Sequence, residues 1–139
     1  MKKYLSEFIG TFSMIFCGCG AMVINDYTGG VITHPGVAIT WGLIVMSMIY
    51  AFGDISGAHF NPAVTLSFAV AKKFSWKEVP MYMTSQFFGA ITASIILLFL
   101  FPKSDLGATI PIIEPLKVFV IELLLSFFLM VVIINVSTG

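Results

Sequence analysis

The sequence predicts an all-α integral membrane protein, and three observations lead to this fold class. Hydrophobic residues make up 58% of the 139 residues and charged residues only 10%, whereas an ordinary soluble domain carries about 25% charged residues. The mean hydropathy is +1.02. The apolar residues also gather in stretches close to the length of about 20 residues that a helix needs to cross a bilayer. Because the net charge is zero, nothing suggests a nucleic-acid partner.

Four apolar stretches predict four membrane spans. They cover about 8–24, 37–52, 80–101 and 116–136. Loops are expected at 25–35 and 103–115, where turn-forming and charged residues collect. Cys17 and Cys19 lie within the first span, where they are too close for a disulfide and too few for a metal site. We interpret them as packing residues and expect no metal and no cofactor.

A polar interruption between the second and third spans predicts a re-entrant segment at 53–71. Gly53 to Phe60 is rich in glycine and polar residues, so it is not expected to form a regular helix. Asn61-Pro62 then has the pattern of a helix start, and residues 63–71 form a nine-residue apolar stretch. A helix of that length covers roughly half of the hydrocarbon core. Irregular backbone at membrane depth must be buried or line a wet cavity, and we expect this one to line a pore.

The lysines predict the orientation of the spans. With the N-terminus inside the cell, the inside segments hold five lysines: Lys2, Lys3, Lys72, Lys73 and Lys77. The outside segments then hold only Lys103 and Lys117. Since cytoplasmic loops carry the excess of basic residues, we expect a multi-pass protein of the cell membrane (plasma or bacterial inner) with a cytoplasmic N-terminus.

A short internal repeat predicts how the spans are grouped. Glu7, Thr11 and Phe12 recur as Glu122, Ser126 and Phe127, an offset of 115 residues. Transporters and channels are often built from inverted repeats. Residues 1–102 would form one repeat of three spans and a half-helix, and 116–139 the first helix of an incomplete second. A second Asn-Pro half-helix would then fall near position 176, at about the same offset.

Several polar groups around the interruption are candidates for solute contact. The Asn61 side chain can cap the half-helix through its oxygen and keep its NH₂ group for a solute. The backbone carbonyls of 57–60 (Gly57, Ala58, His59 and Phe60) could form a row of acceptors. The His59 ring could either fix the loop or contact a solute, and the sequence leaves both open.

Glu7 and Glu122 are carboxylates within predicted spans, where charge is costly and often functional. They could relay protons, or they could accept hydrogen bonds from the backbone of a re-entrant loop; we favour the second, because such a loop needs buried partners. The sequence contains no Ser/His/Asp, paired-carboxylate or phosphate-loop arrangement. An enzyme is therefore not expected.

The string from Ser56 to Thr65, SGAHFNPAVT, resembles the first signature loop of the aquaporin or major intrinsic protein family. Glu7 to Thr11, Gln86 with Gly89-Ala90, and Glu122 agree with the family pattern. The resemblance covers the whole chain but only about the first 60% of a member. It implies six spans, two half-helices meeting at paired Asn-Pro-Ala motifs, and a homotetramer with one pore per subunit. Such channels pass water or small neutral solutes; Asn61, Pro62 and Ala63 match the first motif, and the carbonyls of 57–60 match the acceptor row.

Trp41 matches the aromatic position of the outer selectivity filter. Trp there is typical of glycerol facilitators and nodulin-type members, which pass glycerol and metalloid hydroxides, and 37–43 is most similar to the nodulin type. A packing or lipid-facing Trp is the alternative. The filter arginine, the second Asn-Pro-Ala and two spans are missing. Three hypotheses follow: an N-terminal piece of a passive channel, a homo-oligomeric half-channel active as given, or part of an inverted-repeat transporter that uses Glu7 or Glu122.

Overall fold

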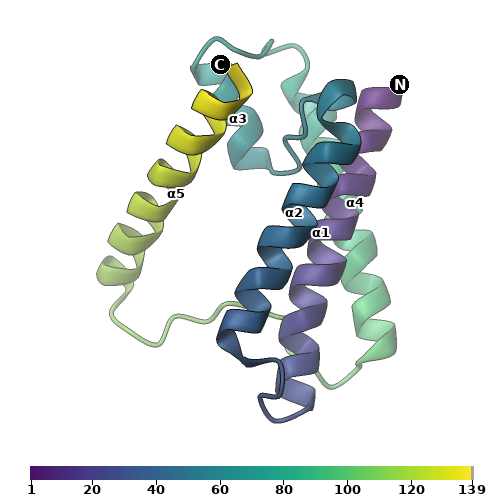
Figure 1. Cartoon of the computed structure of the whole chain (residues 1–139), viewed down its shortest axis with the longest axis vertical. Helices are drawn as coiled ribbons and strands as arrows, with labels where there is room; N and C mark the ends of the chain where they lie inside the picture. Colours follow the sequence, from purple (N-terminus) through teal and green to yellow (C-terminus); the bar gives the residue numbers. More distant parts are fainter. Residues whose placement is uncertain (139) are drawn as a thin grey trace. The chain divides into compact units, whose positions relative to one another are not determined.

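A computed structural model describes residues 1–138, in which all regular structure is helical (Figure 1). The helices are α1 (Lys2–Tyr27), α2 (Thr33–Ser56), α3 (Pro62–Val70), α4 (Val79–Leu100) and α5 (Pro115–Thr138). The all-α prediction is confirmed. Residue 139, the end of the predicted segment 116–139, lies outside the described residues.

Prolines mark where four of these helices begin. They are Pro35, Pro62, Pro80 and Pro115, each in the first turn of its helix. Proline is tolerated there because the first backbone N–H groups of a helix have no partner within it. The helices are longer at most ends than the predicted spans, since an α-helix can continue into polar sequence beyond the hydrocarbon core.

Four helices have the length and composition to cross a membrane: α1, α2, α4 and α5. α3 has nine residues, or about 14 Å, which is too short. The chain is therefore a multi-pass membrane protein with a half-length helix between full-length ones, as predicted.

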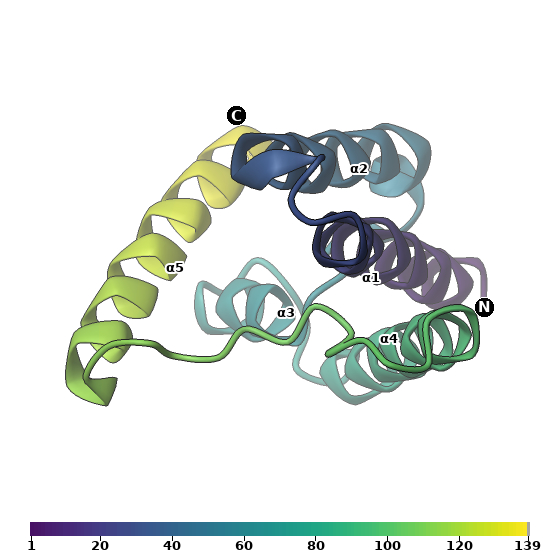
Figure 2. The same cartoon turned by 90° about the horizontal axis from the view of Figure 1, so that it is seen from below.

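The chain divides into two units, Met1–Ala108 and a second that begins at Thr109. In the first unit, α1 lies between α2 and α4, and α3 contacts α4 (Figure 2). Gly89 lets α4 approach α1 closely, since a Cβ at Gly89 would lie 2.5 Å from the Phe8 carbonyl oxygen. Small residues at helix interfaces allow such approach in lipid, where packing drives association.

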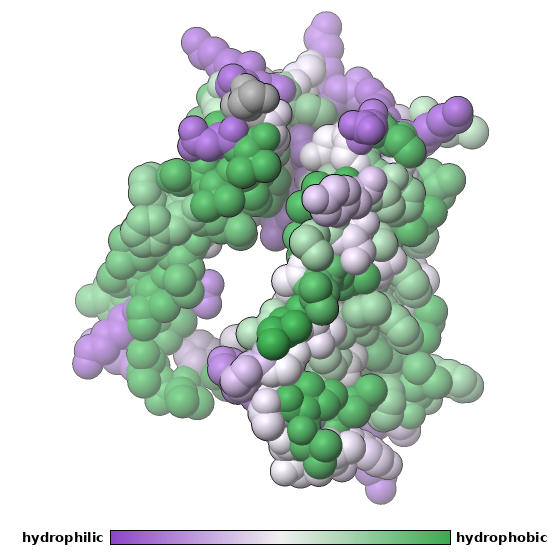
Figure 3. All heavy atoms as spheres, in the orientation of Figure 1, coloured by the Kyte–Doolittle hydropathy of each residue, from purple (hydrophilic) through white to green (hydrophobic). Residues whose placement is uncertain are grey.

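The second unit consists mainly of α5. Its 18-residue apolar window has a mean hydropathy of 2.7, and none of it is buried. Figure 3 shows hydrophobic residues along the length of this helix. Such a surface suits contact with lipid or with other membrane helices.

One boundary differs from the prediction. Residues 53–56 were expected to be irregular, but α2 continues through them and ends at Ser56. The helix stops at Gly57, which adopts a left-handed φ of 82° while its N–H donates to the Gly53 carbonyl at 2.9 Å. Glycine is the usual residue at this capping position because it has no Cβ to clash. The irregular segment between α2 and α3 is thus only residues 57–61.

Candidate functional site

The segment 57–60 has an unusual backbone. Gly57, Ala58 and Phe60 have positive φ angles of 82°, 51° and 49°. For the two residues with a Cβ, this conformation costs about 1–2 kcal/mol each. Such a conformation persists only where the surroundings hold it.

Glu7 holds this backbone from α1. Its carboxylate is 0% exposed and accepts four hydrogen bonds. Oε1 accepts from Ser56 Oγ (2.7 Å) and His59 N (3.0 Å), and Oε2 accepts from Phe60 N (2.7 Å) and Gln86 Nε2 (2.8 Å). Both oxygens therefore act as acceptors, and two of the donors are main-chain groups of the irregular segment.

Most of the carbonyl oxygens of 57–60 have no hydrogen-bond partner within the described residues. Those of Gly57, Ala58 and His59 accept no hydrogen bond from any residue in 1–138. The Phe60 carbonyl accepts from Thr11 Oγ1 at 3.0 Å. Three of the four carbonyls in the predicted row are thus free to accept from water or a solute, and the fourth keeps one lone pair.

Asn61 is the N-cap of α3. Its φ and ψ are −149° and 130°, and its Oδ1 accepts from the Ala63 N–H at 2.8 Å. Asn61 and Ala63 are exposed and Pro62 is half-buried. The Asn61 Nδ2 group has no partner within the described residues, which leaves two donors beside the positive end of the half-helix.

A second set of hydrogen bonds joins α3 to α4. Gln86 Nε2 also donates to Thr65 Oγ1 at 2.9 Å, and Thr65 Oγ1 donates to the Asn61 carbonyl at 3.1 Å. His59 Nδ1 lies 3.1 Å from the same Thr65 oxygen. Glu7, Gln86 and Thr65 thereby connect three helices around the irregular segment.

The His59 ring is enclosed by aromatic side chains. Its centroid lies 4.7 Å from those of Phe68 and Phe74 and 5.2 Å from that of Tyr82. His59 is 8% exposed. Of the two roles that the sequence left open, this packing supports the one in which the ring fixes the loop.

Sequence reasoning did not single out Tyr82, Gly10 or Ser56 as partners of the loop. The Tyr82 hydroxyl donates to the Ser56 carbonyl at 2.9 Å, and the Phe60 ring occupies the place that a Cβ on Gly10 would take. A signal did exist: Tyr82 and Gln86, and likewise Glu7, Gly10 and Thr11, are spaced to lie on one helical face.

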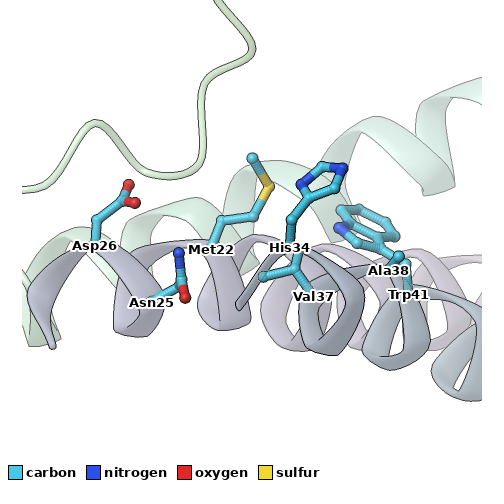
Figure 4. A pocket seen from close by; sticks show the side chains of 7 residues that line it. All are labelled: Met22, Asn25, Asp26, His34, Val37, Ala38 and Trp41. Atoms are coloured by element: carbon cyan, nitrogen blue, oxygen red, sulfur yellow. The ribbon is translucent and has the colours of Figure 1, made fainter. Parts of the chain in front are cut away.

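Trp41 lies apart from this network. Its indole packs on Gly18 of α1, where a Cβ would overlap the ring. Gly18 follows Glu7 by eleven residues, about 16 Å along the helix. Trp41 also lines an open hollow of about 400 Å³, shown in Figure 4. The packing contact and the predicted filter role are compatible, since one ring face rests on glycine while the ring also borders open space.

Glu122 lies on α5, in the second unit. It is exposed and forms no hydrogen bond or ion pair within the described residues. Its predicted support of a second loop stays a prediction.

At the start of α1, Glu78 joins the loop after α3 to the N-terminus. Its Oε2 lies 2.7 Å from Lys3 Nζ and accepts from the Tyr4 hydroxyl at 2.9 Å. Both hydrogen bonds lower the pKa of the Glu78 carboxyl, and the one from Lys3 has the larger effect. The contact closes the same end of the bundle as the Tyr82 and His59 cluster, since Tyr4 packs edge-on against Tyr82.

Together, the four spans and the half-helix opened by Asn-Pro-Ala define a channel-type membrane fold. The family model for major intrinsic proteins matches residues 1–138, and the chain belongs to that family. Its members are channels, not enzymes. The resemblance stated from the sequence is confirmed.

Individual relatives also support the family membership. Aquaporin NIP1-1 of Oryza sativa subsp. japonica is 46% identical over 140 residues, a match that covers 99% of this chain and 49% of the relative. Nodulin-26 of Glycine max is 42% identical, covering 99% of this chain and 52% of the relative. The X-ray structure of the aquaglyceroporin from Plasmodium falciparum is 32% identical with a TM-score of 0.64, over 73% of this chain and 42% of that one. The chain thus spans about half the length of the curated relatives it matches.

Proposed function

We propose that this chain forms the first half of a passive channel for water, glycerol and other small neutral solutes, including metalloid hydroxides. The observation that carries the proposal is the irregular segment 57–61. The carbonyls of 57–59 and the two Asn61 Nδ2 N–H donors have no hydrogen-bond partner within the described residues, and they lie directly before or at the start of a half-length helix. In a membrane, such groups require water or a polar solute beside them.

The chemistry of this segment suits neutral, hydrogen-bonding solutes. A water or hydroxyl group donates to the carbonyls of Gly57, Ala58 and His59 in turn and accepts from Asn61. The partial positive charge at the start of α3 repels cations and protons. Passage then needs no titrating group, and the four donors on Glu7 engage that carboxylate in holding the loop.

Trp41 is proposed as one wall of the selectivity filter. Its indole presents an apolar face and an N–H donor that has no partner within 1–138, which suits the carbon skeleton and hydroxyls of a polyol. The names of the relatives support this assignment, because they include nodulin-type proteins and an aquaglyceroporin.

The remaining parts of the proposal concern assembly and location. Asn61, Pro62 and Ala63 would meet a second Asn-Pro-Ala motif supplied by another polypeptide segment, and the complete channel would be a homotetramer in the cell membrane. The lysine distribution supports a cytoplasmic N-terminus. The second candidate is a half-channel in which copies of this chain pair, favoured by the free donors and carbonyls that the single chain leaves uncovered.

The test is stopped-flow light scattering on proteoliposomes, under sucrose and then glycerol gradients. One sample holds this chain alone, and a second also holds the C-terminal half of aquaporin NIP1-1. Asn61→Asp tests the pore, and Ser75→Asp, which adds the same charge in the loop after α3, is the control. Fast flux that Asn61→Asp alters and Ser75→Asp does not would support the proposal.

The two samples separate the candidates. Flux only with the second half present supports the first-half role, and flux from the chain alone supports the half-channel. Flux that requires a proton gradient would instead indicate a transporter. No flux from either sample, with helicity intact by circular dichroism, would refute the channel.

A further inference from the structure

Four exposed lysines lie at the end of the first unit where α1 and α4 begin. The loop between α3 and α4, residues 71–78, carries three of them, and the first residue of α1 is the fourth. An ion pair between Lys3 and Glu78, at 2.7 Å, joins this loop to the start of α1. Figure 3 shows hydrophilic residues gathered at this end, at the top of the view. We call the four residues the lysine patch: Lys2, Lys72, Lys73 and Lys77.

The protein itself does not neutralise the lysine patch. None of the four ammonium groups forms an ion pair or a hydrogen bond within the described residues. Glu78 already pairs with Lys3, and Glu7 is buried against the irregular segment. Asp54, in the last turn of α2, is the one exposed carboxylate without a partner at this end of the first unit, among the residues that the structure describes. The excess of positive charge therefore favours an anion from outside the chain.

The loop that carries most of the patch has a fixed backbone. Its Phe74 ring centroid lies 4.7 Å from those of both His59 and Tyr82. The Lys73 N–H donates to the Phe68 carbonyl at 2.9 Å, which closes the turn after α3. Because the backbone is held, binding an anion would order only the lysine side chains, and this lowers the entropic cost of association.

Apolar side chains follow the patch toward the spans. Trp76 is 58% exposed, and Leu5 of α1 and Met81 of α4 are also exposed, each in the first turn of its helix. Since α1 and α4 both have the length and composition to cross a membrane, their first turns meet the headgroup region. Tryptophan favours this boundary between headgroups and hydrocarbon. The surface therefore combines positive charge with hydrocarbon in the order that a phospholipid presents phosphate and acyl chain.

We propose that the lysine patch binds the phosphate groups of anionic phospholipids in the leaflet that this end of the bundle meets. The ammonium groups donate hydrogen bonds to the phosphate oxygens. The Trp76 indole lies at the level of the glycerol esters, and the acyl chains run along Leu5 and Met81. Phosphatidylglycerol carries a net negative charge, whereas the choline of phosphatidylcholine cancels its phosphate, so the patch selects the former. The inference goes beyond solute passage and does not depend on it.

Lipid selection can be measured by Trp76 fluorescence on the whole chain in nanodiscs. Trp41→Phe leaves Trp76 as the only tryptophan. Each nanodisc holds phosphatidylcholine with a small fraction of brominated lipid, either phosphatidylglycerol or phosphatidylcholine with the same brominated chains, because bromine quenches an indole only on close approach. Both leaflets of a nanodisc have the same composition, so the result is independent of which way the chain faces.

Paired double variants in this background separate the patch from charge in general. Lys72→Gln with Lys73→Gln removes half of the patch, and Lys103→Gln with Lys117→Gln removes the same charge from exposed lysines outside it. Lys72→Arg with Lys73→Arg keeps the charge. The Trp76 reporter is unchanged in all of them, and circular dichroism first verifies that their helicity equals that of the Trp41→Phe chain.

We expect brominated phosphatidylglycerol to quench Trp76 more strongly than brominated phosphatidylcholine at equal fraction. The association constant of the first relative to the second should fall at least about fivefold in the Gln variant of the patch, the effect of about one lysine near an anionic surface. The Arg variant and the Lys103 and Lys117 variant should keep the preference. Equal quenching by the two lipids in the Trp41→Phe chain, or an equal fall in both Gln variants, would overturn the proposal.

A soluble competitor tests whether the ligand is a lipid. Glycerophosphoglycerol, the free headgroup, is added at the molar concentration of the brominated lipid and at constant ionic strength. It should leave the quenching of Trp76 unchanged, because it has no acyl chains to place beside Leu5 and Met81. Relief of quenching would show that the patch takes soluble phosphates, and the assignment to lipid would be wrong.

Discussion

Replacing Glu7 by glutamine tests whether a buried carboxylate holds the irregular segment. The glutamine side chain has nearly the same shape, but one of its two ends is an NH₂ group. That end would face either the His59 N–H and the Ser56 hydroxyl or the Phe60 N–H and the Gln86 amide. In each orientation at least one main-chain donor loses its acceptor and faces another donor.

The magnitude follows from the number of bonds affected. A buried donor left without a partner costs about 1–3 kcal/mol, and Glu7 is 0% exposed, so water does not replace the acceptor. When the NH₂ group faces Ser56 and His59, the Ser56 hydroxyl can turn to accept from it, so only the His59 N–H is certain to lose its acceptor. We therefore expect a loss of about 1–3 kcal/mol. Typical total stabilities are about 5–15 kcal/mol, so the variant should be clearly destabilised or locally open at the loop.

The assay is amide hydrogen exchange at His59 and Phe60 in nanodiscs, together with thermal unfolding. Each 1.4 kcal/mol of lost protection speeds exchange about tenfold, so an increase of at least about fivefold is expected at one of the two amides. Glu114→Gln is the control, because Glu114 is exposed and its carboxylate pairs only with Lys117 within the described chain. Unchanged exchange at both amides, with the melting temperature of Glu7→Gln equal to that of the control, would refute the reasoning.

Three further predictions concern the surroundings of the loop and filter. Gly18→Ala places a methyl group where the Trp41 ring lies, so the ring must move. In a background in which Trp76 is replaced by Phe, the Trp41 fluorescence emission should shift and its quenching by acrylamide should increase. Identical spectra would contradict the packing. Tyr82→Phe removes the bond to the Ser56 carbonyl and should cost about 1–2 kcal/mol while keeping the ring packing, so thermal stability should fall without a change in helicity; stability equal to that of the original chain would count against it. The pKa of Glu78 is lowered in the folded state, so its contribution to stability is present above the ordinary carboxyl pKa and is lost as pH falls through the lowered value. The stability difference between the original chain and Glu78→Gln should therefore disappear in acid. A difference that grows toward low pH would contradict the ion pair.

The amino-acid sequence by itself determined the membrane class and the order of the elements. Long apolar stretches identify spans because a helix is the structure that satisfies its own backbone in lipid. Asn61-Pro62 marked the start of the half-helix for an equally local reason, since the cap needs only an Asx side chain and a residue without an N–H. Both depend on neighbours in the chain, and both agree with the structure.

The end of α2 shows where local reasoning failed. Gly53 and Gly57 are both compatible with a helix stop, and the prediction placed the irregular segment after the first of them. The structure ends the helix at the second, where Ser56 comes within reach of Glu7 and Tyr82. Helix propensity differs by too little between these positions to decide where the helix ends. The two buried hydrogen bonds that Ser56 makes with other helices can decide it.

Tertiary structure alone decided which side chains meet. Three contacts join residues far apart in the chain: the His59 ring packs against Tyr82, Phe60 packs on Gly10, and Trp41 packs on Gly18. They depend on the rotation and separation of α1, α2 and α4, which close contacts at glycines allow. Sequence periodicity identifies the face of a helix but not the residue that it faces, because that pairing is set by how whole helices pack.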